Sequence, residues 1–362
     1  MVSALMLLGG LVLLVGGAEA LVRGAAKLAG ALGISPLVVG LTVVAFGTSS
    51  PELAVSVSAA FSGESDIAVG NVVGSNIFNV LFILGLSALV APLSVAQQLV
   101  RLDVPIMIAI SMLMPALGLD GRIDRIDGVI LFSLLLAYTV FLVLQSRKES
   151  QEVQEEYARE YAVGEEEKTV RAQWVDLGYV AAGTALLILG SRWLVSGAVD
   201  IAQHFGVSEL VIGLTIVSMG TSAPELATSV VASLRGERDI AVGNVVGSNI
   251  FNMLAVIGFT GLVSPQGIPV AVEVLRFDLP IMIMVALACV PVFFTGMTIA
   301  RWEGGLMLAY YLAYLAHVVL AAVRHPALPS LDGLVLSAML PGSLLALLIL
   351  YRRPAASPAP EG

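Results

Sequence analysis

A stretch of fourteen residues, Asp66–Asn79, recurs without a single change at Asp239–Asn252, 173 positions further along the chain. Each copy reads DIAVGNVVGSNIFN. At the same spacing upstream of each copy lies a second matching element, which reads GTSSPE at 47–52 and GTSAPE at 220–225. The sequence therefore predicts two related halves, and both halves contribute to any site that these motifs build.

The composition is that of a protein that crosses a membrane many times. Hydrophobic residues make up 58% of the chain and charged residues only 12%, whereas about 25% charged residues is usual in a soluble domain. We expect an all-α polytopic membrane protein that is surrounded by the lipid bilayer and binds no nucleic acid. A span takes about 20 apolar residues, and eleven runs qualify, near 1–22, 37–61, 67–91, 103–119, 127–144, 175–199, 209–234, 240–263, 278–295, 304–321 and 331–351.

The order of these runs predicts how the two halves are related. Five runs precede the acidic segment 145–172 and five follow it, and an odd number of crossings returns the second half to the membrane from the opposite face. The repeat is therefore inverted, as in many secondary transporters. We expect a first repeat, a connector, a second repeat, and an extra C-terminal span with a tail, at 1–144, 145–172, 173–321 and 322–362.

The distribution of basic residues predicts the orientation. If the N-terminus lies outside, thirteen of the 18 Lys and Arg residues fall on the cytoplasmic side, which is the side that such residues prefer. We expect a multi-pass protein of the cell membrane, with the N-terminus outside and the connector 145–172 in the cytoplasm.

The GTSSPE element predicts a polar bend inside an apolar helix. Pro51 has no N–H, and its ring crowds the carbonyl of Gly47, so the helix bends and leaves backbone oxygens for another partner, such as a cation. Thr48, Ser49 and Glu52 project from one face of the same helix beside the bend. The second half repeats the whole set with Gly220, Thr221, Ser222, Pro224 and Glu225.

The fourteen-residue motif predicts a facing wall for this bend. Asn71, Ser75 and Asn79 recur every four residues and form a polar stripe on one helix face. The second half repeats the stripe with Asn244, Ser248 and Asn252. The combined ligand set contains carboxylate, hydroxyl, amide and carbonyl oxygens but no His or Cys, and such a set suits Ca²⁺ and Na⁺ rather than zinc or copper.

Glu52 and Glu225 are the acids that fall deep inside the predicted spans. A charged residue at the centre of a bilayer costs at least about 2.5–3.5 kcal/mol, so the pair requires neutralisation by one Ca²⁺, by Na⁺, or by protons. A site that holds either Ca²⁺ or Na⁺ gives a physical basis for antiport. Three alternatives remain: Ca²⁺/H⁺ antiport, a cation channel, and an intramembrane enzyme. No pairing of nucleophile and base supports an enzyme, and no cofactor is expected.

The motifs GTSxPE and GNxxGSN, present twice in inverted halves, resemble the calcium/cation antiporter superfamily, in particular prokaryotic sodium/calcium exchangers. The likeness covers about residues 1–321. It implies a ten-helix exchanger in which extracellular Na⁺ drives Ca²⁺ export, with a sliding gate at 1–30 and 173–203 and no obligate protein partner. It also implies that the ions are held by the main-chain carbonyls of Ala45 and Ser218 and by Thr48, Ser49, Glu52, Ser75, Asn79, Thr221, Ser222, Glu225 and Ser248.

One position departs from some members of that superfamily. Potassium-dependent exchangers have Asp where this chain has Asn252. With Asn at both 79 and 252, the two carboxylates give the site two formal negative charges rather than three. We therefore expect an exchanger that does not co-transport K⁺. Asn252 remains a candidate ligand because it ends the polar stripe of the second half.

Overall fold

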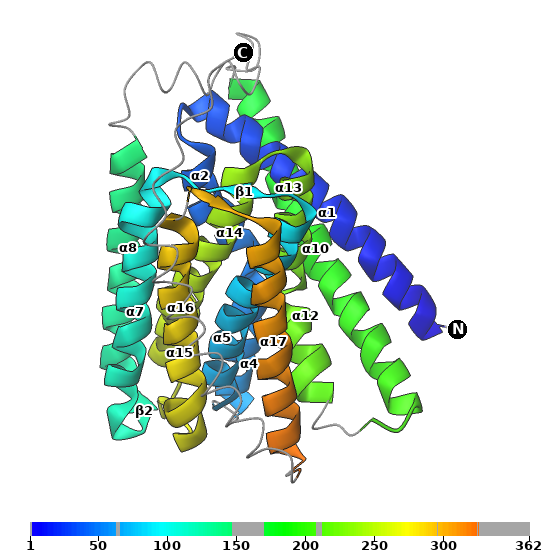
Figure 1. Cartoon of the computed structure of the whole chain (residues 1–362), viewed down its shortest axis with the longest axis vertical. Helices are drawn as coiled ribbons and strands as arrows, with labels where there is room; N and C mark the ends of the chain where they lie inside the picture. Colours follow the sequence, from blue (N-terminus) through cyan, green and yellow to red (C-terminus); the bar gives the residue numbers. More distant parts are fainter. Residues whose placement is uncertain are drawn as a thin grey trace.

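The computed structural model describes residues 2–62, 66–146, 170–207, 212–294, 296–323 and 325, and these residues form a helical bundle (Figure 1). Eight of their helices are long and apolar enough to cross a membrane, and a bent pair, Pro36–Thr48 with Ser50–Ser62, makes nine. The matching segment of the second half, 212–235, contains the corresponding elements η6, α12 and α13. The prediction of an all-α polytopic membrane protein is confirmed. The predicted span 331–351 and most of the connector lie outside the described residues.

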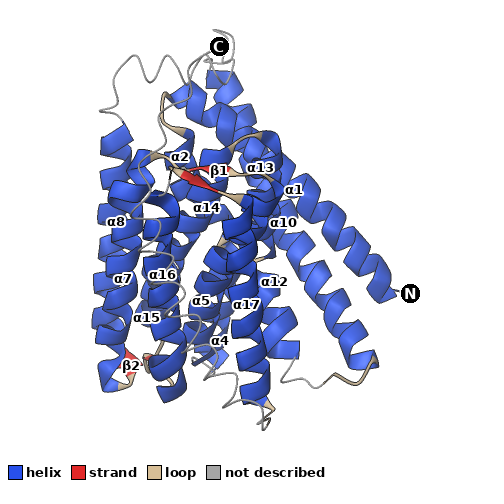
Figure 2. Ribbon diagram, in the orientation of Figure 1, coloured by secondary structure: helices blue, strands red, loops and turns tan. Residues whose placement is uncertain are grey.

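Helices make up most of both halves (Figure 2), and among the described residues the elements follow the same order in each, except that α2 and η4 are found only in the first half. The first half consists of α1 (Val2–Leu32), α2 (Pro36–Val39), η1 (Gly40–Val44), α3 (Ala45–Thr48), α4 (Ser50–Ser62), α5 (Asp66–Phe78), η2 (Asn79–Leu84), α6 (Gly85–Val90), β1 (Leu93–Ser94), η3 (Leu99–Asp103), α7 (Val104–Leu117), η4 (Gly118–Asp120), β2 (Arg122–Ile123) and α8 (Arg125–Ser146). The second half consists of α10 (Val170–His204), η6 (Gly213–Val217), α12 (Ser218–Thr221), α13 (Ala223–Arg235), α14 (Arg238–Phe251), η7 (Asn252–Ile257), α15 (Gly258–Val263), β3 (Ile268–Pro269), η8 (Val274–Asp278), α16 (Leu279–Phe294), β4 (Thr298–Ile299) and α17 (Arg301–Ala322).

Short π-helical segments occur at matching places in both halves. They form three pairs: η1 with η6, η2 with η7, and η3 with η8. The π-helix is rare and often marks a functional position. Here η1 and η6 end directly before Ala45 and Ser218, while η2 and η7 begin at Asn79 and Asn252. Each π-segment of these two pairs therefore borders residues of the two repeated motifs.

The short strands show how the two halves are oriented relative to each other. Strand β1 pairs with β4, and β2 pairs with β3, so each pair joins one strand from each half. Strands β1 and β3 occupy equivalent places in the two halves, yet β1 lies at the upper end of the bundle and the β2–β3 pair lies at the lower end (Figure 2). This is the arrangement that an inverted repeat requires.

The helices that carry the fourteen-residue motif lie at the centre of the bundle. In the spans Ile67–Val90 and Arg238–Val263, 78% and 94% of the most apolar window is buried, compared with 11% for Arg301–Ala322. Because these two spans are shielded by the others, the polar stripe that they carry is kept away from lipid.

Helices α1 and α10 lie side by side along an antiparallel seam of glycines (Figure 1). The seam glycines occur every seven residues, at Gly10, Gly17 and Gly24 on α1 and at Gly183, Gly190 and Gly197 on α10. A Cβ atom on Gly17 would lie 2.9 Å from the Gly183 carbonyl oxygen and 2.9 Å from the Leu187 nitrogen. Small residues at such spacing let two helix backbones meet closely in lipid, so the pair predicted to slide forms one tightly packed unit.

We predict that Gly17→Ala lowers the free energy of unfolding in detergent by about 1–3 kcal/mol, the usual cost of adding a methyl group to a well-packed contact. Gly16→Ala is the matched control, because a Cβ atom there meets nothing within 4 Å. Alanine has the higher helix propensity, so the control should be neutral or stabilising. Equal effects of the two substitutions would contradict the close seam.

Candidate cation site

Both helices that carry a GTSxPE element bend just before the proline of that element. Helix α3 ends and α4 begins around Ser49, whose ψ of 5° is not helical, and the two pieces meet at 43°. Ser222 takes the same place in the second half with a ψ of 10°. The bends follow from Pro51 and Pro224, which cannot donate a backbone hydrogen bond. They turn the hydroxyl and carboxylate groups of each half toward the other half.

Each glutamate accepts a hydrogen bond from the other half of the chain. The Ser49 Oγ donates to Glu225 Oε1 at 3.1 Å, and the Ser222 Oγ donates to Glu52 Oε1 at 2.9 Å. All four side chains are fully buried. The Ser222 Oγ also lies 3.0 Å from the Ser75 Oγ. The two predicted acids therefore lie at one interface. Each is held there by a hydrogen bond from a serine of the other half.

Asn244 supports the bend of its own half and also contacts the other half. Its Nδ2 donates to the Glu225 carbonyl at 3.2 Å and to the Ser229 Oγ at 2.9 Å, while its Oδ1 accepts from the Thr48 Oγ1 at 3.0 Å. The first half repeats this pattern with Asn71, the Glu52 carbonyl, Ser56 and Thr221. These two amides are engaged within the protein, so they hold the site residues in place.

Four asparagines form a second set of contacts between the halves. The Asn79 Nδ2 donates to Asn249 Oδ1 at 3.0 Å, and the Asn252 Nδ2 donates to Asn76 Oδ1 at 3.1 Å. Asn76 and Asn249 also donate to each other's backbone carbonyl, at 3.2 and 3.3 Å. We refer to Asn76, Asn79, Asn249 and Asn252 as the asparagine ring. Asn76 and Asn249 were missed by the sequence reasoning, which followed only the four-residue spacing, although both lie inside the repeated motif.

Four buried oxygen atoms at this interface lack a hydrogen-bond partner among the described residues. They are Glu52 Oε2, Glu225 Oε2, Asn79 Oδ1 and Asn252 Oδ1. The amides of Asn79 and Asn252 point their nitrogens into the asparagine ring, which leaves both oxygens free to accept. A buried acceptor without a partner costs about 1–3 kcal/mol, and acceptors alone suit a cation, because a cation requires oxygen ligands and no donors.

Other predicted ligands lie on the same helices as these four oxygens or directly before the bends. Ser248 contacts Thr48, with 3.4 Å between the hydroxyl oxygens, and the Ala45 carbonyl accepts the Ser49 N–H at 3.0 Å. A carbonyl oxygen has a second lone pair, so this helical bond still permits a ligand role. Only the backbone of Ser218, at the start of α12, is described.

One freed carbonyl of the second half has a partner within the protein. The Gly220 carbonyl, which Pro224 deprives of its helical partner, was expected to need another partner, such as a cation. It accepts instead from the Ser191 Oγ of α10 at 2.6 Å. A hydroxyl on a neighbouring helix satisfies a freed carbonyl as well as an ion does, and no pattern in the sequence pairs these two positions.

The site contains few of the ligands that resident transition metals prefer. Within the described residues, no group of three or more His, Cys, Asp or Glu side chains comes together. Most of the oxygens come instead from amides and hydroxyls, which bind hard cations weakly enough to release them.

Comparisons with known proteins agree with the interpretation of this geometry as a cation site. The model of a family described as "Sodium/calcium exchanger protein" matches residues 2–144 and 175–320. The sodium/calcium exchanger MaX1 of Methanosarcina acetivorans is 33% identical over 343 residues, which cover 87% of this chain and 97% of that protein. The inner membrane protein YrbG of Escherichia coli is 37% identical, with 73% and 81% covered.

A solved structure of the sodium-calcium exchanger NCX_Mj, soaked with 10 mM Na⁺ and zero Ca²⁺, has a similar fold. The TM-score is 0.75 at 29% sequence identity, and the match covers 87% of this chain and 98% of that one.

Two bent helices that meet across a repeat interface, inside an all-helical membrane bundle, are typical of secondary transporters, and the matched family is one of exchangers rather than enzymes. The family model and the solved structure both indicate the same class of transporter. The chain belongs to the sodium/calcium exchanger family.

The asparagine ring predicts energetic coupling between its members. We expect Asn79→Ala and Asn249→Ala to be non-additive, with a coupling energy of about 0.5–3 kcal/mol in the free energy of unfolding, as is usual for residues in contact. The control cycle pairs Asn79→Ala with Ser233→Ala, because the Ser233 hydroxyl bonds locally to the Ser229 carbonyl. Strict additivity in the first cycle would show that the amide contact is absent.

Proposed function

We propose that the protein is a secondary antiporter that exchanges Na⁺ for Ca²⁺ through one shared site between its two halves. The observation that supports this most directly is the group of four unpartnered oxygens on Glu52, Glu225, Asn79 and Asn252. The proposed ligand set is the full group expected from the sequence: Ala45, Thr48, Ser49, Glu52, Ser75, Asn79, Ser218, Thr221, Ser222, Glu225, Ser248 and Asn252.

Charge balance supports competition between the two ions. Two carboxylates in a low-dielectric interior are neutralised by one Ca²⁺ or by monovalent cations, and either choice uses the same oxygens. The site then holds Ca²⁺ or Na⁺ but not both. An empty site retains two uncompensated charges, which opposes its reorientation across the membrane and couples the two fluxes.

The glycine seam supports a mechanism of alternating access to the site. Helices α1 and α10 pack on each other backbone to backbone, while the ligands lie on the central helices α5 and α14 and on the bent segments. We propose that the α1–α10 pair slides over the remaining bundle and opens the site to one side of the membrane at a time. The ligands would stay in place during this motion, as expected for a transporter built from inverted repeats.

The first test measures uptake of radiolabelled Ca²⁺ by proteoliposomes under an imposed Na⁺ gradient. We expect uptake that requires the gradient, and we expect Glu52→Gln and Glu225→Gln each to abolish it because each variant removes one charge and one anionic ligand. Glu273→Gln, at an exposed carboxylate, is the matched control and should transport normally.

Uptake driven by a pH gradient in Na⁺-free buffer would instead favour Ca²⁺/H⁺ antiport. Ca²⁺ movement that needs no counter-ion would favour a channel. Near-normal exchange by either glutamate variant would refute the proposed site.

The second test concerns K⁺. With Asn rather than Asp at positions 79 and 252, the site has two formal negative charges, and a third would be needed to balance one Ca²⁺ together with one K⁺. Na⁺-driven Ca²⁺ uptake should therefore be the same when K⁺ is replaced by choline on both sides. An absolute requirement for K⁺ would overturn this part of the proposal.

We further propose that the N-terminus lies outside and that the connector 145–172 is cytoplasmic, joining repeats 1–144 and 173–321, with the segment 322–362 as an additional span and tail. The native thiol, Cys289, is buried, so introduced cysteines can be labelled selectively. In intact cells, an impermeant maleimide should label Leu119→Cys, beside β2, but not Ser94→Cys in β1. The opposite pattern would reverse the orientation.

A further inference from the structure

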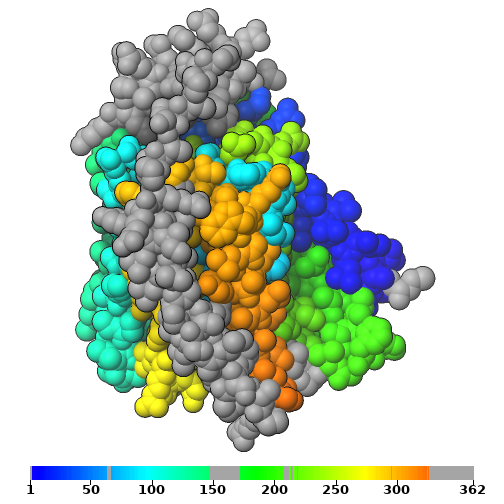
Figure 3. Space-filling model, viewed as in Figure 1, coloured from blue at the N-terminus to red at the C-terminus, as the bar shows by residue number. Residues whose placement is uncertain are grey.

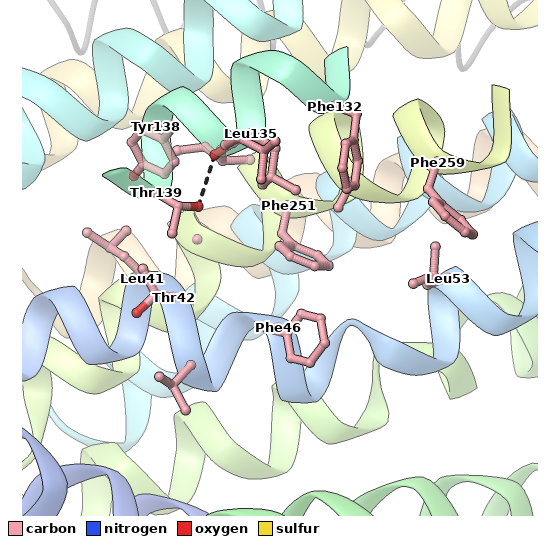
Figure 4. Close-up of a pocket in the computed structure, with 15 residues that line it drawn as sticks. Leu41, Thr42, Phe46, Leu53, Phe132, Leu135, Tyr138, Thr139, Phe251 and Phe259 are labelled. Atoms are coloured by element: carbon pink, nitrogen blue, oxygen red, sulfur yellow. Dashed lines mark hydrogen bonds between the residues drawn. The ribbon is translucent and has the colours of Figure 1, made fainter. Parts of the chain in front are cut away.

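A groove on the outer side of the bent segment is separate from the cation site. It has a volume of about 540 Å³ and lies between the α2–α4 segment, α8 and the α14–α15 segment (Figure 4). Its walls are mainly aromatic and aliphatic, with Phe46, Leu53, Leu135, Phe251 and Phe259 among them. All three walls belong to membrane-spanning helices, so the groove lies within the apolar part of the membrane.

The groove opens at the surface of the bundle. Phe46 on α3 is 57% exposed and Leu136 on α8 is 55% exposed, although both line the groove. Around membrane-spanning helices, the medium that reaches such an opening is lipid hydrocarbon. A hydrocarbon chain can therefore enter from the side without crossing a polar layer.

The few polar groups of the lining are already paired within the protein. The Thr42 Oγ1 donates to the Val38 carbonyl at 2.6 Å, and the Thr139 Oγ1 donates to the Leu135 carbonyl at 2.9 Å (Figure 4). The Tyr138 hydroxyl donates to the Asp103 carboxylate at 2.9 Å. Each donor is used, so the lining has little to offer a sugar, a nucleotide or a phosphate, and its chemistry suits an apolar occupant.

At the equivalent place, where the roles of the two halves are exchanged, the protein's own side chains fill the space. There, Phe78, Phe82 and Tyr311 form a cluster in which ring centroids lie 4.8 to 5.3 Å apart. Phe78 corresponds to Phe251 by the 173-residue offset, and among the described residues Phe251 has only Phe46 as a ring partner, at 5.4 Å.

At two positions the groove has a smaller side chain than the equivalent place. By the same offset, Phe82 corresponds to Ala255. The Tyr138–Asp103 and Tyr314–Asp278 contacts align α8 with α17 and place Leu135 opposite Tyr311. The groove therefore lacks two aromatic rings that fill the equivalent place, and an apolar occupant can take up the space that those rings occupy there.

We infer that the groove is a binding site for the acyl chain of a membrane phospholipid. The chain lies against Phe46, whose neighbours in sequence are Ala45 and Gly47, and so packs on the back of the bend that presents Thr48 and Glu52 to the cation site. The inference does not depend on which ions are exchanged.

The test uses proteoliposomes that contain a phosphatidylcholine with a photoreactive diazirine on its acyl chain, followed by mapping of labelled peptides by mass spectrometry. Wild-type protein should be labelled at peptides that contain Phe46 and Phe251, above the level at the lipid-exposed face of α1. Ala255→Phe and Leu135→Tyr, which insert the two rings of the equivalent place from opposite walls, should each lose that excess while labelling of α1 stays unchanged.

Phe82→Ala is the converse variant and should gain labelling at peptides that contain Phe78 and Tyr311. Equal labelling of wild type and both filling variants would overturn the inference. So would wild-type labelling no higher than on α1, which would mean that the groove excludes lipid or is covered by another part of the protein. Monodisperse elution in detergent establishes that each variant is folded before it is compared.

Discussion

The structure depends on a reciprocal contact between a serine hydroxyl and a glutamate from the opposite half of the chain. Ser49 bonds to Glu225, and Ser222 bonds to Glu52, with every one of these side chains fully buried. Each carboxylate thus has one oxygen held by the protein and one oxygen without a partner among the described residues. Because the two contacts are equivalent, neither half can build the site alone, and the bends, the π-segments and the central position of α5 and α14 all serve to bring the halves together.

The sequence alone was sufficient for the architecture and for most of the candidate site. The duplicated motif, the apolar runs and the odd number of spans predicted an all-helical membrane bundle, and the spacing of Thr48, Ser49 and Glu52 around Pro51 predicted a polar bend that the structure contains. These features follow from local rules, because a proline ends a hydrogen-bond ladder wherever it occurs in a helix. Their ligand role remains a proposal.

Other features could not be predicted, because they depend on which helices become neighbours. The pairing of Ser191 with the Gly220 carbonyl joins two helices that share no motif. The π-segments that begin at Asn79 and Asn252 have no composition that sets them apart from an α-helix. The members of the asparagine ring could have been predicted, since Asn76 and Asn249 belong to the repeated fourteen residues. Their crossed contacts appear only when the two copies face each other.

The central claim is that Na⁺ and Ca²⁺ share one set of oxygens. Equilibrium binding of Ca²⁺ to the purified protein, measured at increasing Na⁺ with choline keeping the ionic strength constant, tests it most directly. The account predicts that the apparent Kd for Ca²⁺ rises continuously with Na⁺ and reaches no plateau. An apparent Kd that stays constant, or that levels off while Ca²⁺ is still bound, would contradict it, because the two ions would then occupy separate sites.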